Sequence, residues 1–244
     1  MPSTIPWSRV AAEGAAIVLS ILLAFAIQAS WEKRTERRSE LEYLEALRDE
    51  LDANAGAIDS NSNVAAGTRE HLENALRLME AGLYVDSAEV FVSSIVRAGT
   101  SAGPPRISTA VHDDLTSSGR AVLIRDADLR RSVLAYYTAM DLMLQRMERR
   151  SDELDVDLYA VVARHLPPGT LRRPRNSFSV SLDESTSGRL GLRSVADDIG
   201  TDSTVRRELR AAFLLQEDER AFRDVMKEAT LATRDRIALV LDRR

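Results

Sequence analysis

The strongest candidate for chemistry in this sequence is the run His112-Asp113-Asp114. Imidazole and carboxylate groups suit a metal ion that activates water for hydrolysis. A helical metal-dependent phosphohydrolase would combine His112 and Asp113 with an earlier histidine, here His71, and a later aspartate. Three residues could supply that last ligand: Asp126, Asp128 and Asp141. The competing interpretation is a helix end, because a His-Asp pair arises easily by chance.

Other kinds of catalysis have less support. The chain has no cysteine, which excludes disulfides, cysteine-ligated zinc, iron–sulfur clusters and cysteine nucleophiles. No Gly-x-Ser-x-Gly elbow and no glycine-rich phosphate loop occurs, and Ser117-Ser118-Gly119 fits a helix end better than a nucleophile. The net charge of -5 argues against a nucleic-acid partner. We therefore expect a non-enzymatic protein without metal, cofactor or small-molecule substrate.

The densest basic cluster consists of Arg172, Arg173 and Arg175, next to Pro167-Pro168 and Pro174. Such a cluster can contact acidic lipid headgroups or an acidic partner. A solvated loop is the alternative interpretation.

The N-terminal region contains a long apolar stretch. No residue from Gly14 to Trp31 is charged, and Val10 to Ala12 extend the stretch toward the N-terminus. At 1.5 Å per residue, this length crosses about 30 Å of hydrocarbon. Trp7 and Trp31 stand at the two ends, where indole rings favour the headgroup layer. The pattern predicts a tail at 1–9 and a transmembrane helix at 10–31. The alternatives are a buried soluble helix and a signal peptide cleaved near Ala24-Phe25-Ala26.

Small residues four apart would let a second membrane helix approach this span closely. The pairs are Ala11 with Ala15, Ala12 with Ala16, and Ser20 with Ala24. More basic residues follow the span than precede it, since only Arg9 precedes Lys33, Arg34, Arg37 and Arg38. The positive-inside rule therefore favours the cytoplasm over the periplasm for the C-terminal part.

The rest of the chain predicts an all-α soluble domain. Leu44, Leu47, Leu51 and Ile58 have helical spacing, so residues 32–82 should form a stalk helix and a helical hairpin. We expect the hairpin to break at Gly56 or at 60–63, with Thr68 capping its second helix.

Further helices are predicted at 86–96, 107–115, 126–150 and 151–165, within a helical domain at 83–166. The capping-box spacing of Asp86 and Glu89 marks the start of the first. Residues 167–202 should form a loop or a small hairpin near 176–193, because Phe178, Val180 and Leu182 alternate with serine. In that hairpin Ser187-Gly188 would form the turn to Leu190 and Leu192. C-terminal helices at 203–244 should then pack on the same domain.

Two stretches resemble an uncharacterised bacterial family of single-pass membrane proteins with a helical soluble domain of unknown function. The first is Glu13, the run Ser20 to Gln28, Trp31, Leu44 and Leu47. The second is Asp114 to Gly119, Leu123-Ile124, Leu129-Arg130 and Tyr136-Tyr137. The resemblance covers about residues 10–165, but Ser20 stands where glycine is usual and one extra residue separates Gln28 from Trp31. It implies a membrane-anchored helical protein and supplies no catalytic residues.

These observations together predict a membrane-anchored accessory or scaffold subunit in the bacterial inner membrane. Its partners would be the lipid bilayer and other integral membrane proteins, or further copies of itself. One specific hypothesis is a subunit that stabilises a large energy-converting complex, such as a photosynthetic reaction centre with its antenna. The alternatives are a self-associating envelope or signalling protein and the metal-dependent phosphohydrolase using His112 and Asp113.

Overall fold

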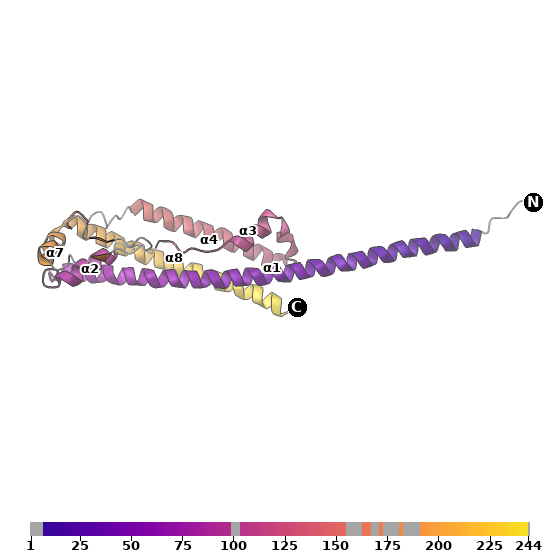
Figure 1. Ribbon diagram of the computed structural model, residues 1–244, viewed down its shortest axis with the longest axis horizontal. Helices are drawn as coiled ribbons and strands as arrows, with labels where there is room; N and C mark the ends of the chain where they lie inside the picture. The colour runs from indigo at the N-terminus through magenta and orange to yellow at the C-terminus, as the bar shows by residue number, and fades with distance from the viewer. Residues whose placement is uncertain are drawn as a thin grey trace, which may run out of the picture.

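A computed structural model of the chain describes residues 7–98, 103–154, 163–166, 171–172, 181–182 and 191–243. The side chains of residues 7–17, 151–154, 171–172 and 181–182 lie outside that description. The described part is predominantly helical, which confirms the predicted all-α class. Helix α1 (Trp7–Glu80) runs the full length of the molecule, and the other helices pack along its C-terminal part (Figure 1).

Three long helices lie side by side next to the point where α1 leaves the bundle. Helix α4 (Ala127–Leu154) runs in the same direction as α1, and α8 (Ser203–Asp242) runs antiparallel to both (Figure 1). Helix α3 (Ala110–Ser117) and the 3-10 helix η1 (Arg120–Leu123) precede α4 in the chain and contact α1 at this end. Their apolar side chains form one hydrophobic cluster, called here the proximal core: Leu44, Leu47, Leu51, Ile58, Leu115, Ile124, Leu129, Val133, Tyr136, Tyr137, Met140, Met147, Met226 and Ile237.

A second cluster fills the far end of the bundle. Helices α2 (Ala88–Ala98) and α7 (Leu192–Thr201) pack there against the end of α1 and the start of α8. The cluster is called here the distal core, and its largest fully buried members are Leu72, Phe91, Ile95, Ile199 and Leu209. Asp202 begins α8 by accepting a hydrogen bond from the backbone N–H of Thr204 at 2.7 Å.

Several predicted element ends are confirmed. Helix α2 begins at Ala88, within the predicted capping sequence 86–89, and α4 agrees with the predicted 126–150 helix. Helix α3 ends at the predicted Ser-Ser-Gly sequence, where Gly119 adopts a left-handed φ of 70°. The predicted helix at 151–165 falls largely outside the described residues.

The predicted helical hairpin within 32–82 is wrong. Helix α1 passes through Gly56 and residues 60–63 without interruption, and Thr68 lies inside the helix, where its hydroxyl donates to the carbonyl of Val64. The polar residues that suggested a break are used in packing instead. Asn54 and Asn61 bond to the backbone of Ser108 and Gly103, 54 and 42 residues further along the chain.

The predictions for the C-terminal part also need correction. Strands β1 (Leu171–Arg172) and β2 (Ser181–Leu182) form a two-residue antiparallel pair in which Leu182 faces Leu171. Leu182 was expected to pair with the segment around Leu192, but Leu192 is the first residue of α7. The predicted turn at 187–188 lies outside the described residues. A single 40-residue helix, α8, replaces the several C-terminal helices expected.

Among the described residues, no helix is both long enough and apolar enough to cross a lipid bilayer. The predicted span at 10–31 begins in the part of α1 whose side chains lie outside the description.

Candidate functional site

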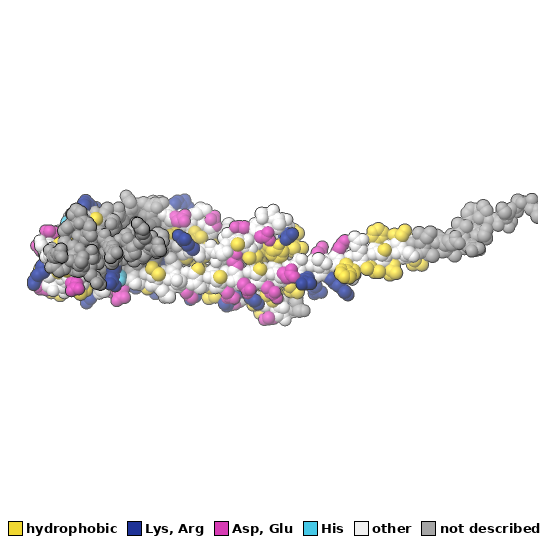
Figure 2. Space-filling model, viewed as in Figure 1, with side chains coloured by type: hydrophobic (Ala, Val, Ile, Leu, Met, Phe, Trp, Pro, Cys, Tyr) yellow, Lys and Arg dark blue, Asp and Glu magenta, His cyan; other side chains and the backbone are white. Residues whose placement is uncertain are grey.

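The N-terminal part of α1 projects from the bundle as a single helix, called here the arm and comprising residues 18–38. Every side chain of the arm is exposed. Its large apolar residues are between 50% and 69% exposed: Val18, Leu19, Ile21, Leu22, Leu23, Phe25, Ile27 and Trp31. Figure 2 shows these side chains as an apolar band separated from the bundle by charged residues. Residues 18–31 of the arm therefore form a contiguous apolar surface that the described chain leaves uncovered.

Two of the six residues predicted to allow close packing of membrane helices, Ser20 and Ala24, lie on this exposed arm. The side chains of the other four, Ala11, Ala12, Ala15 and Ala16, lie outside the described residues. Trp31 is exposed near the charged end of the arm, and Trp7 is the first residue of α1. Arg172 belongs to β1, but its side chain, like residues Arg173 and Arg175, lies outside the description.

A polar contact fixes the point where the arm joins the bundle. Glu40 is fully buried, and its carboxylate accepts a hydrogen bond from the backbone N–H of Arg125 at 2.8 Å. The Arg125 guanidinium lies 3.8 Å from the same carboxylate and 3.3 Å from that of Glu36. It also donates to the backbone carbonyl of Lys33 at 3.5 Å. The start of α4 is thus tied to α1 only a few residues beyond Trp31.

The carboxylate of Glu50 organises the loop before α3. It accepts hydrogen bonds from the Tyr137 hydroxyl at 2.5 Å, from the Ser108 hydroxyl at 2.9 Å and from the backbone N–H of Val111 at 2.9 Å. Burial and the bond to Glu50 raise the pKa of Tyr137 well above its ordinary value, so the phenol stays protonated and donates. These contacts hold α1, α3 and α4 together, so the role of the Glu50 carboxylate is structural.

The residues proposed as metal ligands are dispersed. His112 stacks on the ring of Tyr137, with ring centroids 4.2 Å apart, and its Nδ1 lies 3.2 Å from the Asp113 carboxylate. A hydrogen bond from the Thr109 hydroxyl, followed by the contact with His112, lowers the pKa of Asp113. Asp114 accepts a hydrogen bond from Tyr43.

The other candidate ligands also have separate positions. Asp126 caps the start of α4, Asp128 pairs with Arg131, and Asp141 accepts from Gln145. His71 is on α1 next to Leu72 of the distal core, away from α3. Within the described parts of the chain, no three His, Asp or Glu residues come together as metal ligands would.

A layer of polar residues separates the two cores, and sequence reasoning did not find it. Its members, called here the polar layer, are Asn61, Gln216, Glu219 and Arg223. Glu219 and Arg223 are 0% and 1% exposed and form an ion pair at 2.8 Å. Arg223 also donates to the side chain of Asn61 at 2.7 Å and to the carbonyl of Gly103 at 3.4 Å. Burial raises the pKa of Glu219, although Arg223 opposes the shift.

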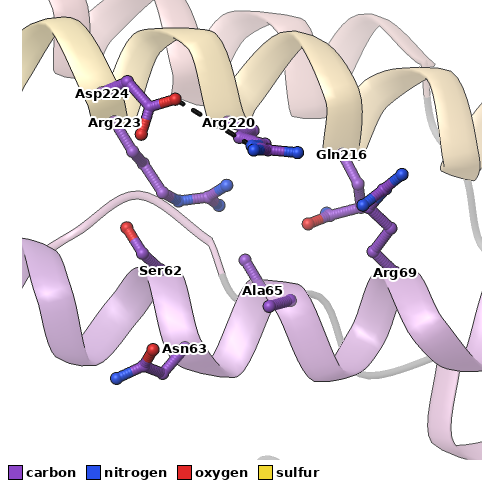
Figure 3. Close-up of a pocket in the computed structure, with 9 residues that line it drawn as sticks. Ser62, Asn63, Ala65, Arg69, Gln216, Arg220, Arg223 and Asp224 are labelled. Carbon is purple, nitrogen blue, oxygen red and sulfur yellow. Dashed lines mark ion pairs between the residues drawn. The ribbon is translucent and has the colours of Figure 1, made fainter.

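The polar layer borders a pocket between α1 and α8 with a volume of about 360 Å³ (Figure 3). Three arginines line it, Arg69, Arg220 and Arg223, together with one acidic side chain, Asp224. Glu217 and Glu219, which are not part of the lining, pair with Arg69 and Arg223. Glu219 and Arg223 are four residues apart on α8. In the sequence, this spacing is the same as that of an ion pair on an exposed helix surface. Only their position midway between two apolar stretches of α8 could have indicated burial.

Comparisons of the chain with known protein families, with curated proteins and with solved structures give no match.

Proposed function

We propose that this protein is a membrane-anchored, non-enzymatic scaffold subunit. In this proposal the stretch from about residue 10 to Trp31 inserts into the inner membrane, and the bundle stands on the cytoplasmic side. The bundle and the anchor together pack against another integral membrane protein. Stabilising a large energy-converting complex is one form that this task could take, and self-association is the alternative.

The exposure of the arm is the observation that carries the proposal. Burying one large aliphatic or aromatic side chain contributes about 1.5–3 kcal/mol, so eight such residues left in water are a large unfavourable surface. Contiguous apolar patches of this kind mark sites that another phase or molecule covers. A bilayer is the covering that fits an arm apolar on all faces, since a single protein groove would cover only one face.

The sequence on both sides of the described arm also favours a lipid bilayer as its covering. The charge-free stretch continues back to Gly14, and Lys33, Arg34, Arg37 and Arg38 follow Trp31 directly. Four basic residues at this end favour the cytoplasmic side. The contact between Arg125 and Lys33 would then place the start of α4 close to the membrane surface.

A matched pair of variants tests the anchor. Leu23 on the arm and Leu214 on α8 are both 63% exposed. Arginine within the span should cost about 2.5–3.5 kcal/mol of insertion free energy per substitution. We therefore expect Leu19→Arg/Leu23→Arg to move the protein out of the membrane fraction in a flotation assay. The control, Leu214→Arg/Val225→Arg, should float like the wild type.

A wild-type protein that stays in the aqueous fraction without detergent would disprove the anchor. The scaffold part is tested separately, by extracting the wild type in mild detergent and identifying the membrane proteins that co-purify. Recovery of the chain alone, as a monomer, would contradict the scaffold role while leaving the anchor intact.

A further inference from the structure

The unpaired polar atoms of the bundle are concentrated around one pocket. In the described part of the chain, five buried side-chain atoms lack a hydrogen-bond partner, and all belong to Arg69 of α1 or to residues 216–223 of α8. Two of them, Arg69 Nε and Glu217 Oε1, still face each other as an ion pair. The other three are Gln216 Oε1, Glu219 Oε1 and Arg223 Nη1. Buried polar atoms are nearly always paired, so a cluster of exceptions calls for an explanation.

The pocket offers both donors and an acceptor. Arg223, 1% exposed, and Gln216, 4% exposed, line its buried side, and Figure 3 shows both side chains directed into the space between α1 and α8. Arg220 stands at the open side, with its side chain 62% exposed and 4.0 Å from Asp224. A guanidinium has five N–H donors, and one carboxylate partner uses at most two of them. The arginines therefore keep donors available after their ion pairs are counted.

The pocket has the size of a small-molecule site. Its volume of about 360 Å³ lies at the lower end of the range for ligand pockets. Water alone could occupy such a space, since a water molecule bridges polar groups readily. Lipid headgroups are too far away: the pocket residues of α1 begin at Ser62, about 45 Å along the helix from Trp31. The occupant must therefore reach the pocket from the aqueous phase.

We propose that this pocket binds a small water-soluble solute that carries an oxyanion, phosphate or carboxylate, together with a hydroxyl group. Arg223 and Arg220 donate to the oxyanion, since guanidinium groups bind carboxylate and phosphate with matching geometry. The side-chain carbonyl of Gln216 accepts from the hydroxyl of the solute. Binding here would join α1 to α8 midway between the two cores.

Titration of the full-length protein in detergent tests this site. Inorganic phosphate and glycolate are the two probes, since each has an oxyanion and a hydroxyl, and chloride at equal ionic strength is the reference. We expect one probe to bind by calorimetry and to raise the melting temperature above the chloride reference. The probe that binds identifies the group as phosphate or carboxylate.

Two pairs of variants locate the binding. Arg220→Gln should weaken it at least tenfold. Arg38→Gln, which breaks a comparable i,i+4 pair between the last residue of the arm and Glu42, should not. Ala66→Leu should fill the pocket opening and weaken binding, whereas Ala53→Leu, at an exposed site elsewhere on α1, should leave it unchanged.

Failure of both probes to bind the wild type would leave water as the occupant and overturn the proposal. Equal affinity of wild type and Arg220→Gln would overturn it as well. Neither outcome bears on the membrane anchor, because flotation does not depend on the pocket.

Discussion

Helix α1 has two parts that are similarly rich in apolar residues and differ in what covers them. On the arm, every large apolar side chain from Val18 to Trp31 is exposed. Past Glu40, the helix buries Leu44, Leu47 and Leu51 completely. The arm carries no charge on any side from Val18 to Trp31, whereas the bundle part is apolar on one face only. One unbroken helix thus combines a surface suited to lipid with a surface suited to other helices.

Removing the arm should have the largest effect, because it takes away membrane association and leaves the bundle part of α1 in place. We expect a chain that lacks residues 1–31 to move entirely into the aqueous fraction, because the apolar stretch is gone. Its bundle should keep its melting temperature within about 3 °C, the shift that roughly 1 kcal/mol produces in a domain of this size. Fractionation and circular dichroism measure the two results. Loss of the helical fold would show that the arm and the bundle are not independent.

The polar layer should be the most sensitive point within the bundle. Glu219→Ala leaves Arg223 buried without its carboxylate partner, which costs about 3–5 kcal/mol. Asp224→Ala, which removes the partner of the exposed Arg220, should cost no more than about 1 kcal/mol. Chemical denaturation measures both changes. A small effect of Glu219→Ala would mean that Asn61, the Gly103 carbonyl and the pocket replace the carboxylate as partners of Arg223.

Glu219 also predicts a pH dependence. Because its pKa is raised in the folded protein, the folded state holds this proton more tightly than the unfolded state does. Its contribution to stability should therefore fall as pH rises from the ordinary glutamate value of 4.5 through the folded-state pKa. Glu219→Gln should remove this part of the slope, so an unchanged slope would contradict the raised pKa.

A pair of leucine substitutions should define the boundary between the two parts of α1. Leu47 is fully buried in the proximal core, and Leu23 is 63% exposed on the arm. Leu47→Ala should lower the free energy of unfolding by about 2–5 kcal/mol through lost burial and a cavity. Leu23→Ala should change it by less than about 0.5 kcal/mol. Denaturation in the same detergent measures both, and equal effects would mean that the arm folds back on the bundle.

Local signals predicted much of the fold. The helical class, the start of α2, the Ser-Ser-Gly end of α3 and the extent of α4 follow from periodicity, capping residues and one glycine. The break expected near Gly56 was wrong because Asn54 and Asn61 find partners in the segment 103–108, which no local pattern reveals. Helix α7 was missed because a run rich in serine and glycine precedes it.

The sequence by itself determined which stretch is apolar on all sides, where helices can begin and end, and that cysteine chemistry is absent. These properties depend on neighbours within a few turns of helix. Only the tertiary structure decided that α1 is continuous, that Glu219 and Arg223 are buried, and that the proposed metal ligands lie apart. Those outcomes depend on contacts between α1, the segment 103–108 and α8, and burial changes the energy of a charged group far more than its position in the sequence does.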